Sequence, residues 1–267
     1  MVKAAEKVEY FFEGPKNRFL AGLAESPPWC VTRERVWGTP LPIWVCEDCG
    51  EKSGAYSRKA IVRMALELPD GPSFELHRPW IDRVVLKCQK CGGRAFREPF
   101  VLDTWHNSGA SPYASFTDEE FREYVPVDFL TEGIDQTRGW AYTLLLLNVI
   151  RTGKPVSPYR AFLFQGHVLD ESGRKMSKRL GNVVWGLEVL RNFSVDLVRF
   201  YMLAKGSPAD SINYDPKEMN GRPYQVLNTL YHLHFYLQQN GEVDGYDPSR
   251  NTLEWAAKRR LLTTVDR

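Results

Sequence analysis

Residues 127–169 read VDFLTEGIDQTRGWAYTLLLLNVIRTGKPVSPYRAFLFQGHVL, and this stretch decides the fold. Its first part, residues 127–130, is a short apolar run of the strand type, and residues 131–134 are predicted to turn. Residues 136–150 have the apolar content of a long helix, and residues 159–169 predict a second strand. Strand, helix and strand in this order predict parallel strands joined by a crossover helix, so the expected fold class is α/β.

The sequence on either side of this stretch divides into segments of different character. Residues 1–28 read as an N-terminal connecting segment, and residues 29–125 as a module, rich in Pro and Gly, that leads into the α/β part. The α/β part covers residues 126–210, and a helical appendage is expected over residues 211–267. One helical face of the appendage carries apolar side chains, namely Val226, Leu227, Leu230, Leu233 and Leu237.

Several shorter elements are predicted from local pattern. Residues 19–24 suggest a short helix, and residues 81–86 an extended run. Thr117 is followed by three acidic residues, which is typical of a capped helix start with a solvated first turn. A charged helix is also expected from Leu253 onward.

Composition excludes several classes of protein. The chain has 267 residues, and 35 basic against 33 acidic side chains leave a net charge of +2, which gives no charge argument for wrapping a long nucleic acid. Apolar residues at 43% and charged residues at 25% exclude a wholly disordered chain. The best apolar run, residues 141–150, is too short for a membrane span, and no signal-peptide core opens the chain, so we expect no membrane partner and a cytoplasmic location.

Four of the five cysteines form two C-x-x-C pairs, Cys46 with Cys49 and Cys88 with Cys91. Two residues between cysteines let both thiolates of a pair reach one tetrahedral ion, and this predicts a structural zinc site without an open position for chemistry. Unrelated buried cysteines or a redox pair are the alternatives, although a redox pair does not explain the duplication. The remaining cysteine, Cys30, is expected to be buried.

A basic loop, GRKMSKRLG, spans residues 173–181. Glycines at both edges allow such a loop to close over a polyphosphate, and the ammonium groups of Lys175 and Lys178 can neutralise charge on departing pyrophosphate oxygens. The loop does not have the G-x-x-x-x-G-K-[ST] pattern of a P-loop. The alternative is an ordinary solvated basic loop.

The segment EGIDQTRGW, residues 132–140, follows the first predicted strand. Gly133 allows close approach of a ligand to the backbone, and Asp135 is placed to cap the following helix. Gln136 and Trp140 lie four residues apart, so they are expected on one helix face at the mouth of the strand, where an amide and an indole can hold an amino acid. The alternative is simply a well-packed helix start.

These motifs, in this order, resemble the class I aminoacyl-tRNA synthetases, and specifically the isoleucyl-tRNA synthetase family. WCVTRERVWGTPLPIW at residues 29–44 resembles the stretch that follows the family's editing insertion. LDTW at residues 102–105, Ser-Gly at residues 108–109, residues 132–140, and residues 166–182 with their Lys-Met-Ser-Lys core follow in the family's order.

The resemblance implies half of a nucleotide-binding, Rossmann-like parallel sheet over residues 126–210, with a small four-cysteine zinc module and an appendage that begins an anticodon-binding-type helical region. It also implies a fragment, because the family's His-x-Gly-His motif is not in this sequence and there is no room for an editing domain. The implied function is that of the distal catalytic half of an isoleucine–tRNA ligase, with poor activity of the chain alone. The implied partners are ATP with magnesium, isoleucine, an isoleucine-type tRNA, and a complementary chain carrying the missing half.

The resemblance also implies roles for individual residues. Lys178, with Lys175, is expected to contact ATP phosphates. The residues expected to line the adenylate are Glu132, Gly133, Asp135 and Gln136, and those expected to pass along the adenine are Gly166, His167 and Val168. The residues expected near the isoleucine side chain are Trp105, Gln136 and Trp140.

Two alternatives to catalysis remain open from the sequence. One is a synthetase-like protein that binds nucleotide or tRNA without catalysis. It is favoured by positions that depart from the family pattern, namely His106, Asn107, Gln165 and Arg179. The other is a zinc-ribbon binding module with the α/β part as its scaffold, for which Lys175 and Lys178 would be dispensable.

Overall fold

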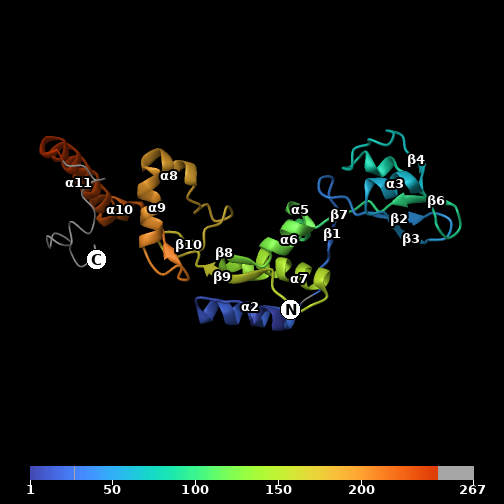
Figure 1. Cartoon of the computed structure of the whole chain (residues 1–267), viewed down its shortest axis with the longest axis horizontal. Coiled ribbons are helices and arrows are strands. Elements are labelled where there is room, and N and C mark those ends of the chain that lie inside the picture. Colours follow the sequence, from blue (N-terminus) through green and yellow to red (C-terminus); the bar gives the residue numbers. More distant parts are fainter. Residues whose placement is uncertain (27, 246–267) are drawn as a thin grey trace. The chain divides into compact units, whose positions relative to one another are not determined.

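The computed structural model describes residues 1–26 and 28–245. It consists of two compact units, Met1–Gln165 and Gly166–Arg267, and each is described by itself. Figure 1 labels the helices and strands of both units. No helix among the described residues combines the length and the apolarity that a membrane span requires.

The stretch that decides the fold forms a parallel strand pair in the first unit. Strand β8 (Val127–Gly133) pairs with β9 (Tyr159–Gln165), and the helix α7 (Trp140–Thr152) connects them after the short 3-10 helix η2 (Ile134–Arg138). The predicted strand–helix–strand order is therefore confirmed. The predicted turn at residues 131–134 is wrong for its first part, because β8 continues to Gly133 with its ladder to β9 intact.

Strand β9 is buried on both faces, as expected of a strand between covering helices. Helix α2 (Glu13–Glu25), which includes the predicted helix at residues 19–24, follows the short helix α1 (Val2–Ala5) and lies beside the β8–β9 pair (Figure 1). Glu9 adds a parallel bridge to Ala161 at the other edge of β9. One apolar cluster joins these elements, with members Phe19, Leu23, Leu144, Leu145, Tyr159, Phe162 and Phe164.

The module within residues 29–125 contains a five-stranded antiparallel sheet in the order β3-β2-β6-β5-β4. Its strands are β2 (Ile43–Cys46), β3 (Lys52–Gly54), β4 (Ala65–Glu67), β5 (Val85–Lys87) and β6 (Arg94–Arg97). Helix α3 (Arg58–Met64) begins at the Ser57 cap. The extended run predicted at residues 81–86 is partly wrong, because Ile81–Arg83 form the 3-10 helix η1 before β5.

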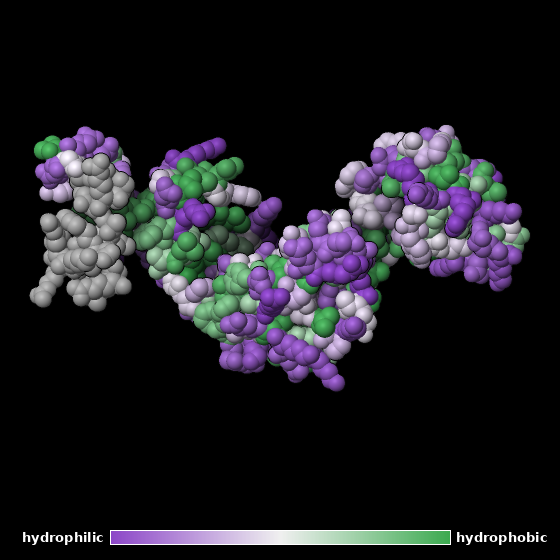
Figure 2. Space-filling view, viewed as in Figure 1, coloured by the Kyte–Doolittle hydropathy of each residue, from purple (hydrophilic) through white to green (hydrophobic). Residues whose placement is uncertain are grey.

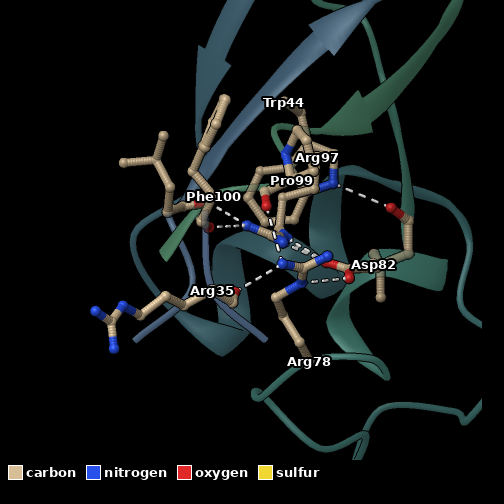
Figure 3. Close-up of polar contacts among 9 residues, drawn as sticks. Arg35, Trp44, Arg78, Asp82, Arg97, Pro99 and Phe100 are labelled. Atoms are coloured by element: carbon tan, nitrogen blue, oxygen red, sulfur yellow. Dashed lines mark hydrogen bonds and ion pairs between the residues drawn. The ribbon is translucent and has the colours of Figure 1, made fainter. Parts of the chain in front are cut away.

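A partly buried charge network lies at the carboxyl end of β6, as Figure 3 shows. The Arg97 side chain has no exposed surface, and its guanidinium donates to Asp82 and to the backbone oxygens of Leu41 and Phe100. Arg78 donates to the same carboxylate over 2.8 Å and to two further backbone oxygens (Figure 3). Asp82 therefore connects two arginines that hold separate loops of the module.

A two-stranded antiparallel link and three short helices lie between the module and β8. The strands are β1 (Thr32–Arg33) and β7 (Val101–Leu102), and the helices are α4 (Thr104–Gly109), α5 (Ser111–Ser115) and α6 (Asp118–Tyr124). The predicted cap is confirmed, because Thr117 and Glu120 form a reciprocal capping box. The surface over α6 is hydrophilic, which agrees with a solvated acidic first turn (Figure 2).

The structure shows a mixed α/β chain, but it does not show a parallel Rossmann sheet. Among the described residues, the parallel ladders are only β8 with β9 and, in the second unit, β10 with β11. Short turns at the cysteine pairs join β2 to β3 and β5 to β6 in the larger sheet. A short turn makes the next strand antiparallel, because a parallel partner requires a long crossover connection.

The second unit packs helices against a very short parallel pair. Its elements are β10 (Val168–Leu169), β11 (Ile212–Asn213), α8 (Gly186–Asn192), α9 (Val195–Ala204), α10 (Pro216–Met219) and α11 (Arg222–Asp244). The strand predicted over residues 159–169 is interrupted at Gly166 and His167, between β9 and β10. The core consists of Val189, Leu197, Tyr201, Tyr214 and Met219.

Helix α11 lies where the helical appendage was predicted. Few of the described residues pack against the apolar side chains along its predicted stripe. Leu227 packs against the core of the unit, whereas Leu230, Leu233 and Leu237 are each more than half exposed. The charged helix predicted from Leu253 lies outside the described residues.

Candidate functional site

The two cysteine pairs come together at one end of the antiparallel sheet. All four sulfur atoms lie within 4.8 Å of one another, with 3.5 Å between the Sγ atoms of Cys46 and Cys91 and 3.7 Å between those of Cys49 and Cys88. Tetrahedral thiolates around zinc, at about 2.3 Å from the metal, are separated by about 3.8 Å. The predicted four-cysteine cluster is therefore confirmed, and its size fits a zinc ion.

The backbone around the cluster is shaped for metal-binding knuckles. Gly50 and Gly92 adopt φ values of 69° and 80°, which favour glycine, and their N–H groups donate to the carbonyl oxygens of Cys46 and Cys88. Backbone N–H groups of Cys91 and Lys90 point at the sulfur of Cys88 and lower the pKa of this thiol to about 6, whereas the neighbouring thiols raise the pKa of Cys91 to about 12. The four sulfur atoms thus share their protons, and one of them ionises readily.

Cys30 corrects the sequence-based expectation of burial. It is exposed, and its sulfur lies 3.5 Å from the backbone oxygen and 3.7 Å from the hydroxyl of Thr32. The reason is that its neighbours carry the local packing instead. Both Trp29 and Arg33 donate to the buried carboxylate of Asp103, over 2.7 and 2.6 Å, which leaves the Cys30 side chain facing outward.

A second cluster forms at the carboxyl end of β8, where Gln136 caps α7. Its Oε1 atom accepts a hydrogen bond from the Trp140 N–H over 2.9 Å, and its Nε2 atom donates to Asp135 over 3.0 Å. The prediction that Asp135 caps this helix is wrong. Because Ile134–Arg138 form a 3-10 helix before α7 begins, the side chain in reach of the first helical N–H is that of Gln136.

Two tryptophans complete this cluster around the buried Gly139. The Trp140 indole donates to the Ser108 carbonyl over 2.9 Å, which fixes its ring against α4. A Cβ atom at Gly139 would clash with the Gln136 amide and would lie 3.0 Å from the ring of Trp105. The absence of a side chain at Gly139 thus allows Gln136 and Trp105 to pack closely beside Trp140. Sequence reasoning did not assign that role to Gly139.

The other predicted residues of this region lie at the end of β8 or directly after it. Glu132 and Asp135 are exposed, and Gly133 is half-buried and pairs with Gln165 in the parallel ladder. Two carboxylates and an open backbone therefore border the Gln136 cluster. This arrangement can attract an ammonium group.

In the second unit, Gly166, His167 and Val168 form a short backbone edge. The Gly166 N–H donates to Pro208, the His167 carbonyl accepts from Ile212, and Val168 pairs with Ile212 in β10. A Cβ atom at Gly166 would clash with the backbone of Asp210, so this position requires glycine. The edge leaves Val168 more than a third exposed.

The basic loop lies in the same unit and exposes both of its predicted lysines. Lys175 and Lys178 are exposed, whereas Met176 between them packs against the core of the unit. The Lys178 ammonium lies 5.6 Å from the centre of the Trp185 ring, at cation–π distance. Because the methionine is anchored, the two lysines are directed to solvent, where they can contact a phosphate.

Comparison with known proteins defines the class of this chain. Residues 1–215 match the family described as tRNA synthetases class I (I, L, M and V). This match covers most of the chain, and the chain therefore belongs to the class I tRNA synthetase family.

Curated relatives narrow the resemblance to isoleucine–tRNA ligases. Those of Methanopyrus kandleri and Pyrobaculum aerophilum are 36% and 38% identical over 95% and 91% of this chain. The isoleucine–tRNA ligase of Bacillus thuringiensis is 35% identical over 96% of it. The chain spans about a quarter of the length of these relatives, 25% in each case.

Solved structures agree with this assignment. The ternary complex of LeuRS, tRNA and LeuAMS from Agrobacterium radiobacter K84 superposes with a TM-score of 0.60 and 25% identity, over 80% of this chain and 28% of that chain. The methionyl-tRNA synthetase of Mycobacterium tuberculosis in complex with methionyl-adenylate gives a TM-score of 0.50 at 17% identity, over 82% of this chain and 33% of that chain, which concerns the fold alone.

Proposed function

We propose that this chain is the distal catalytic part of an isoleucine–tRNA ligase, which binds ATP, isoleucine and the isoleucyl-adenylate and contributes to the charging of tRNA. The observation that carries the proposal is the cluster of Trp105, Gln136 and Trp140 at the carboxyl end of β8, in a chain of the class I family. Ligands of open α/β sheets bind at this end of the strands.

The reaction proposed for the whole enzyme has two steps. The ionised carboxylate of isoleucine attacks the α-phosphorus of ATP, the bond to the bridging oxygen breaks, and pyrophosphate leaves. A hydroxyl group of tRNA then attacks the acyl carbon, and AMP leaves. Since the first nucleophile is already ionised, catalysis rests on positioning and on stabilisation of negative charge, rather than on a protein base.

On the phosphate side, the proposed groups are the ammoniums of Lys175 and Lys178. Both are exposed, and no ion pair to either is found among the described residues. A cationic loop of this kind lowers the barrier where charge grows on the departing pyrophosphate, which ATP carries together with its magnesium ion. Gly166, His167 and Val168 offer backbone polar groups and an apolar side chain for the adenine.

On the amino-acid side, Trp105 and Trp140 are the proposed apolar contacts for the isoleucine side chain. Glu132, Asp135 and the amide of Gln136 are the proposed partners of its ammonium group, and Gly133 allows the adenylate to approach the backbone. A pocket of this kind separates isoleucine from valine by only about 1–3 kcal/mol, so selectivity is a separate question from binding.

For the metal, we propose that zinc is held by Cys46, Cys49, Cys88 and Cys91. When bound, zinc supplies structural cross-linking of two turns, since four thiolates leave no open coordination position for chemistry. The cysteines themselves fix the β2–β3 and β5–β6 turns relative to each other.

Isoleucine-dependent ATP–pyrophosphate exchange tests the proposal. We expect the chain alone to exchange very poorly, and exchange to appear when a polypeptide carrying the family's His-x-Gly-His half is added. Substitution Lys178→Ala should abolish most of the restored activity. Exchange by the chain alone at the rate of a full-length enzyme would contradict the fragment, and binding of adenylate without exchange in any mixture would favour the non-catalytic alternative.

A further inference from the structure

The basic loop is tied at its base by a buried carboxylate that the sequence did not single out. Asp170 is only 7% exposed and accepts four hydrogen bonds. Its Oδ1 atom accepts from the backbone N–H groups of Ser172 and Arg174, at 3.0 and 2.8 Å. Its Oδ2 atom accepts from the Arg174 guanidinium at 3.0 Å and from the amide of Asn182 at 2.8 Å.

Asn182 completes the tie from the other end of the loop. While its Nδ2 atom donates to Asp170, its Oδ1 atom accepts from the backbone N–H of Ser177 over 2.9 Å. The same Nδ2 atom lies 3.3 Å from the carbonyl oxygen of Lys175. Two side chains thus bind backbone groups on both sides of Met176.

The ammonium groups of the two lysines take no part in this tie. Its hydrogen bonds end on the side chains of Asp170 and Asn182, and Lys175 enters it through its backbone carbonyl. Hydrogen bonds from Asn182 and Arg174 hold the pKa of Asp170 below its ordinary value, so the carboxylate is ionised at neutral pH. The loop shape is therefore set before any phosphate arrives.

We infer that Asp170 and Asn182 are positioning residues, which hold residues 172–182 in the one loop shape that presents the ammoniums of Lys175 and Lys178 to a polyphosphate. The phosphate part of this inference rests on the proposed function, whereas the holding of the loop does not. Pre-formed loops bind more tightly because less conformational entropy is lost on binding.

An exchange of the two side chains tests the inference. In Asp170→Asn, the new N–H₂ group must face either the loop N–H donors or the amide N–H₂ of Asn182. Two donors then oppose each other, and a hydrogen bond is lost. In Asn182→Asp, two carboxylates face each other across the former 2.8 Å contact. The double variant Asp170→Asn/Asn182→Asp restores one donor opposite one acceptor and keeps the acceptors for Ser172, Arg174 and Ser177. It loses the bond from the Arg174 guanidinium and the weaker bond from position 182 to the Lys175 carbonyl.

The first measurement is limited digestion with trypsin, which cleaves after Arg174, Lys175, Lys178 and Arg179 once the loop opens. We expect each single variant to be cleaved in the loop roughly tenfold faster than the unmodified chain, and the double variant to return to within about threefold. Glu171→Gln is the matched control. It removes the neighbouring charge, which pairs only with Lys217 at 3.6 Å, and should leave cleavage unchanged.

The second measurement is calorimetric titration with magnesium ATP on the same variants. We expect roughly tenfold weaker binding in each single variant and recovery in the double variant. The midpoints of thermal unfolding should not follow this pattern, because the effect on binding comes from the loop and not from global stability. Loop cleavage at the unmodified rate in both single variants, or no recovery in the double variant, would overturn the inference. Normal cleavage effects with no ATP binding by any chain would instead contradict the proposed function and leave the loop-holding role standing.

Discussion

The four-cysteine cluster and the Lys-Met-Ser-Lys loop position their charged groups in different ways. At the cluster, the cysteine side chains proposed to bind zinc would themselves be the cross-link between two turns of one sheet. In the loop, the ammonium groups expected to meet phosphate take no part in the hydrogen bonds of Asp170 and Asn182 that hold the loop, and their placement depends on Asp170, Met176 and Asn182. A metal site can thus be predicted from its ligands alone. The shape of a phosphate-binding loop depends also on neighbouring residues that carry no positive charge.

Loss of the metal should give the largest effect. Cys88→Ser or a zinc chelator should unfold the antiparallel sheet, because metal binding to such sites contributes on the order of 10 kcal/mol to folding. Elemental analysis measures the zinc, and hydrogen exchange over β2, β5 and β6 measures the fold. The β8–β9 pair should keep its protection, since its core contains no residue of the module.

Cys30→Ser is the matched control for this experiment, because Cys30 is exposed and lies outside the cluster. It should change neither the zinc content nor the protection of the sheet. A Cys88→Ser chain that retains one equivalent of zinc and a protected sheet would contradict the claim that the four cysteines cross-link the sheet through a metal.

The Asp82 network should give the next largest effect. Asp82→Asn leaves the fully buried guanidinium of Arg97 without its counter-charge, and this should lower the free energy of unfolding by about 3 kcal/mol. Chemical denaturation followed by tryptophan fluorescence, to which the buried Trp44 of this module contributes, measures the loss. Asp70→Asn breaks a more exposed pair with Arg83 and should cost less than about 1 kcal/mol.

The same carboxylate predicts a pH dependence. Although burial opposes ionisation, hydrogen bonds from Arg78 and Arg97 hold the pKa of Asp82 below its ordinary value. A lowered pKa in the folded state stabilises the fold above about pH 4, and the contribution is lost as pH falls toward the lowered value. The difference in stability between the unmodified chain and Asp82→Asn should therefore shrink on acidification. A difference that grows toward acid would contradict this assignment of charge.

Removal of the α7 cap should give the smallest effect. Gln136→Ala takes away the acceptor for the Trp140 N–H and should cost about 1 kcal/mol of stability. Gln136→Met keeps the size of the side chain but offers no acceptor to the Trp140 N–H, so it should be about as unstable as Gln136→Ala. Thermal denaturation of the two variants, compared with the unmodified chain, distinguishes a cap from a side chain that merely fills space, for which Gln136→Met would be as stable as the unmodified chain.

Sequence reasoning succeeded where spacing alone determines the structure. The C-x-x-C pairs predict the four-sulfur cluster, the Thr117 pattern predicts a capping box, and the alternation of strand and helix predicts the parallel β8–β9 pair. The capping box depends on contacts within a few residues, the cluster on two copies of one motif, and the parallel pair on one strand–helix–strand unit.

Sequence reasoning was wrong where the structure is determined by contacts between residues distant in sequence, or by a local change from α-helix to 3-10 helix. Cys30 is exposed because Trp29 and Arg33 bind Asp103, which lies 70 or more residues away. Asp135 does not cap α7 because a 3-10 turn shifts the helix start. The roles of Asp170 and Asn182 had no signal in charge or periodicity, since each is an ordinary polar residue beside a conspicuous basic motif.

Calorimetric titration with a non-hydrolysable isoleucyl-adenylate analogue tests the central claim most directly. The unmodified chain should bind it, and both Lys178→Ala and Gln136→Ala should weaken binding by roughly tenfold, since each removes a charge-assisted or buried polar contact. Lys217→Ala, at an exposed lysine of the same unit as Lys178, should bind normally. Normal affinity in both Lys178→Ala and Gln136→Ala would contradict the adenylate-binding role proposed for each of these residues.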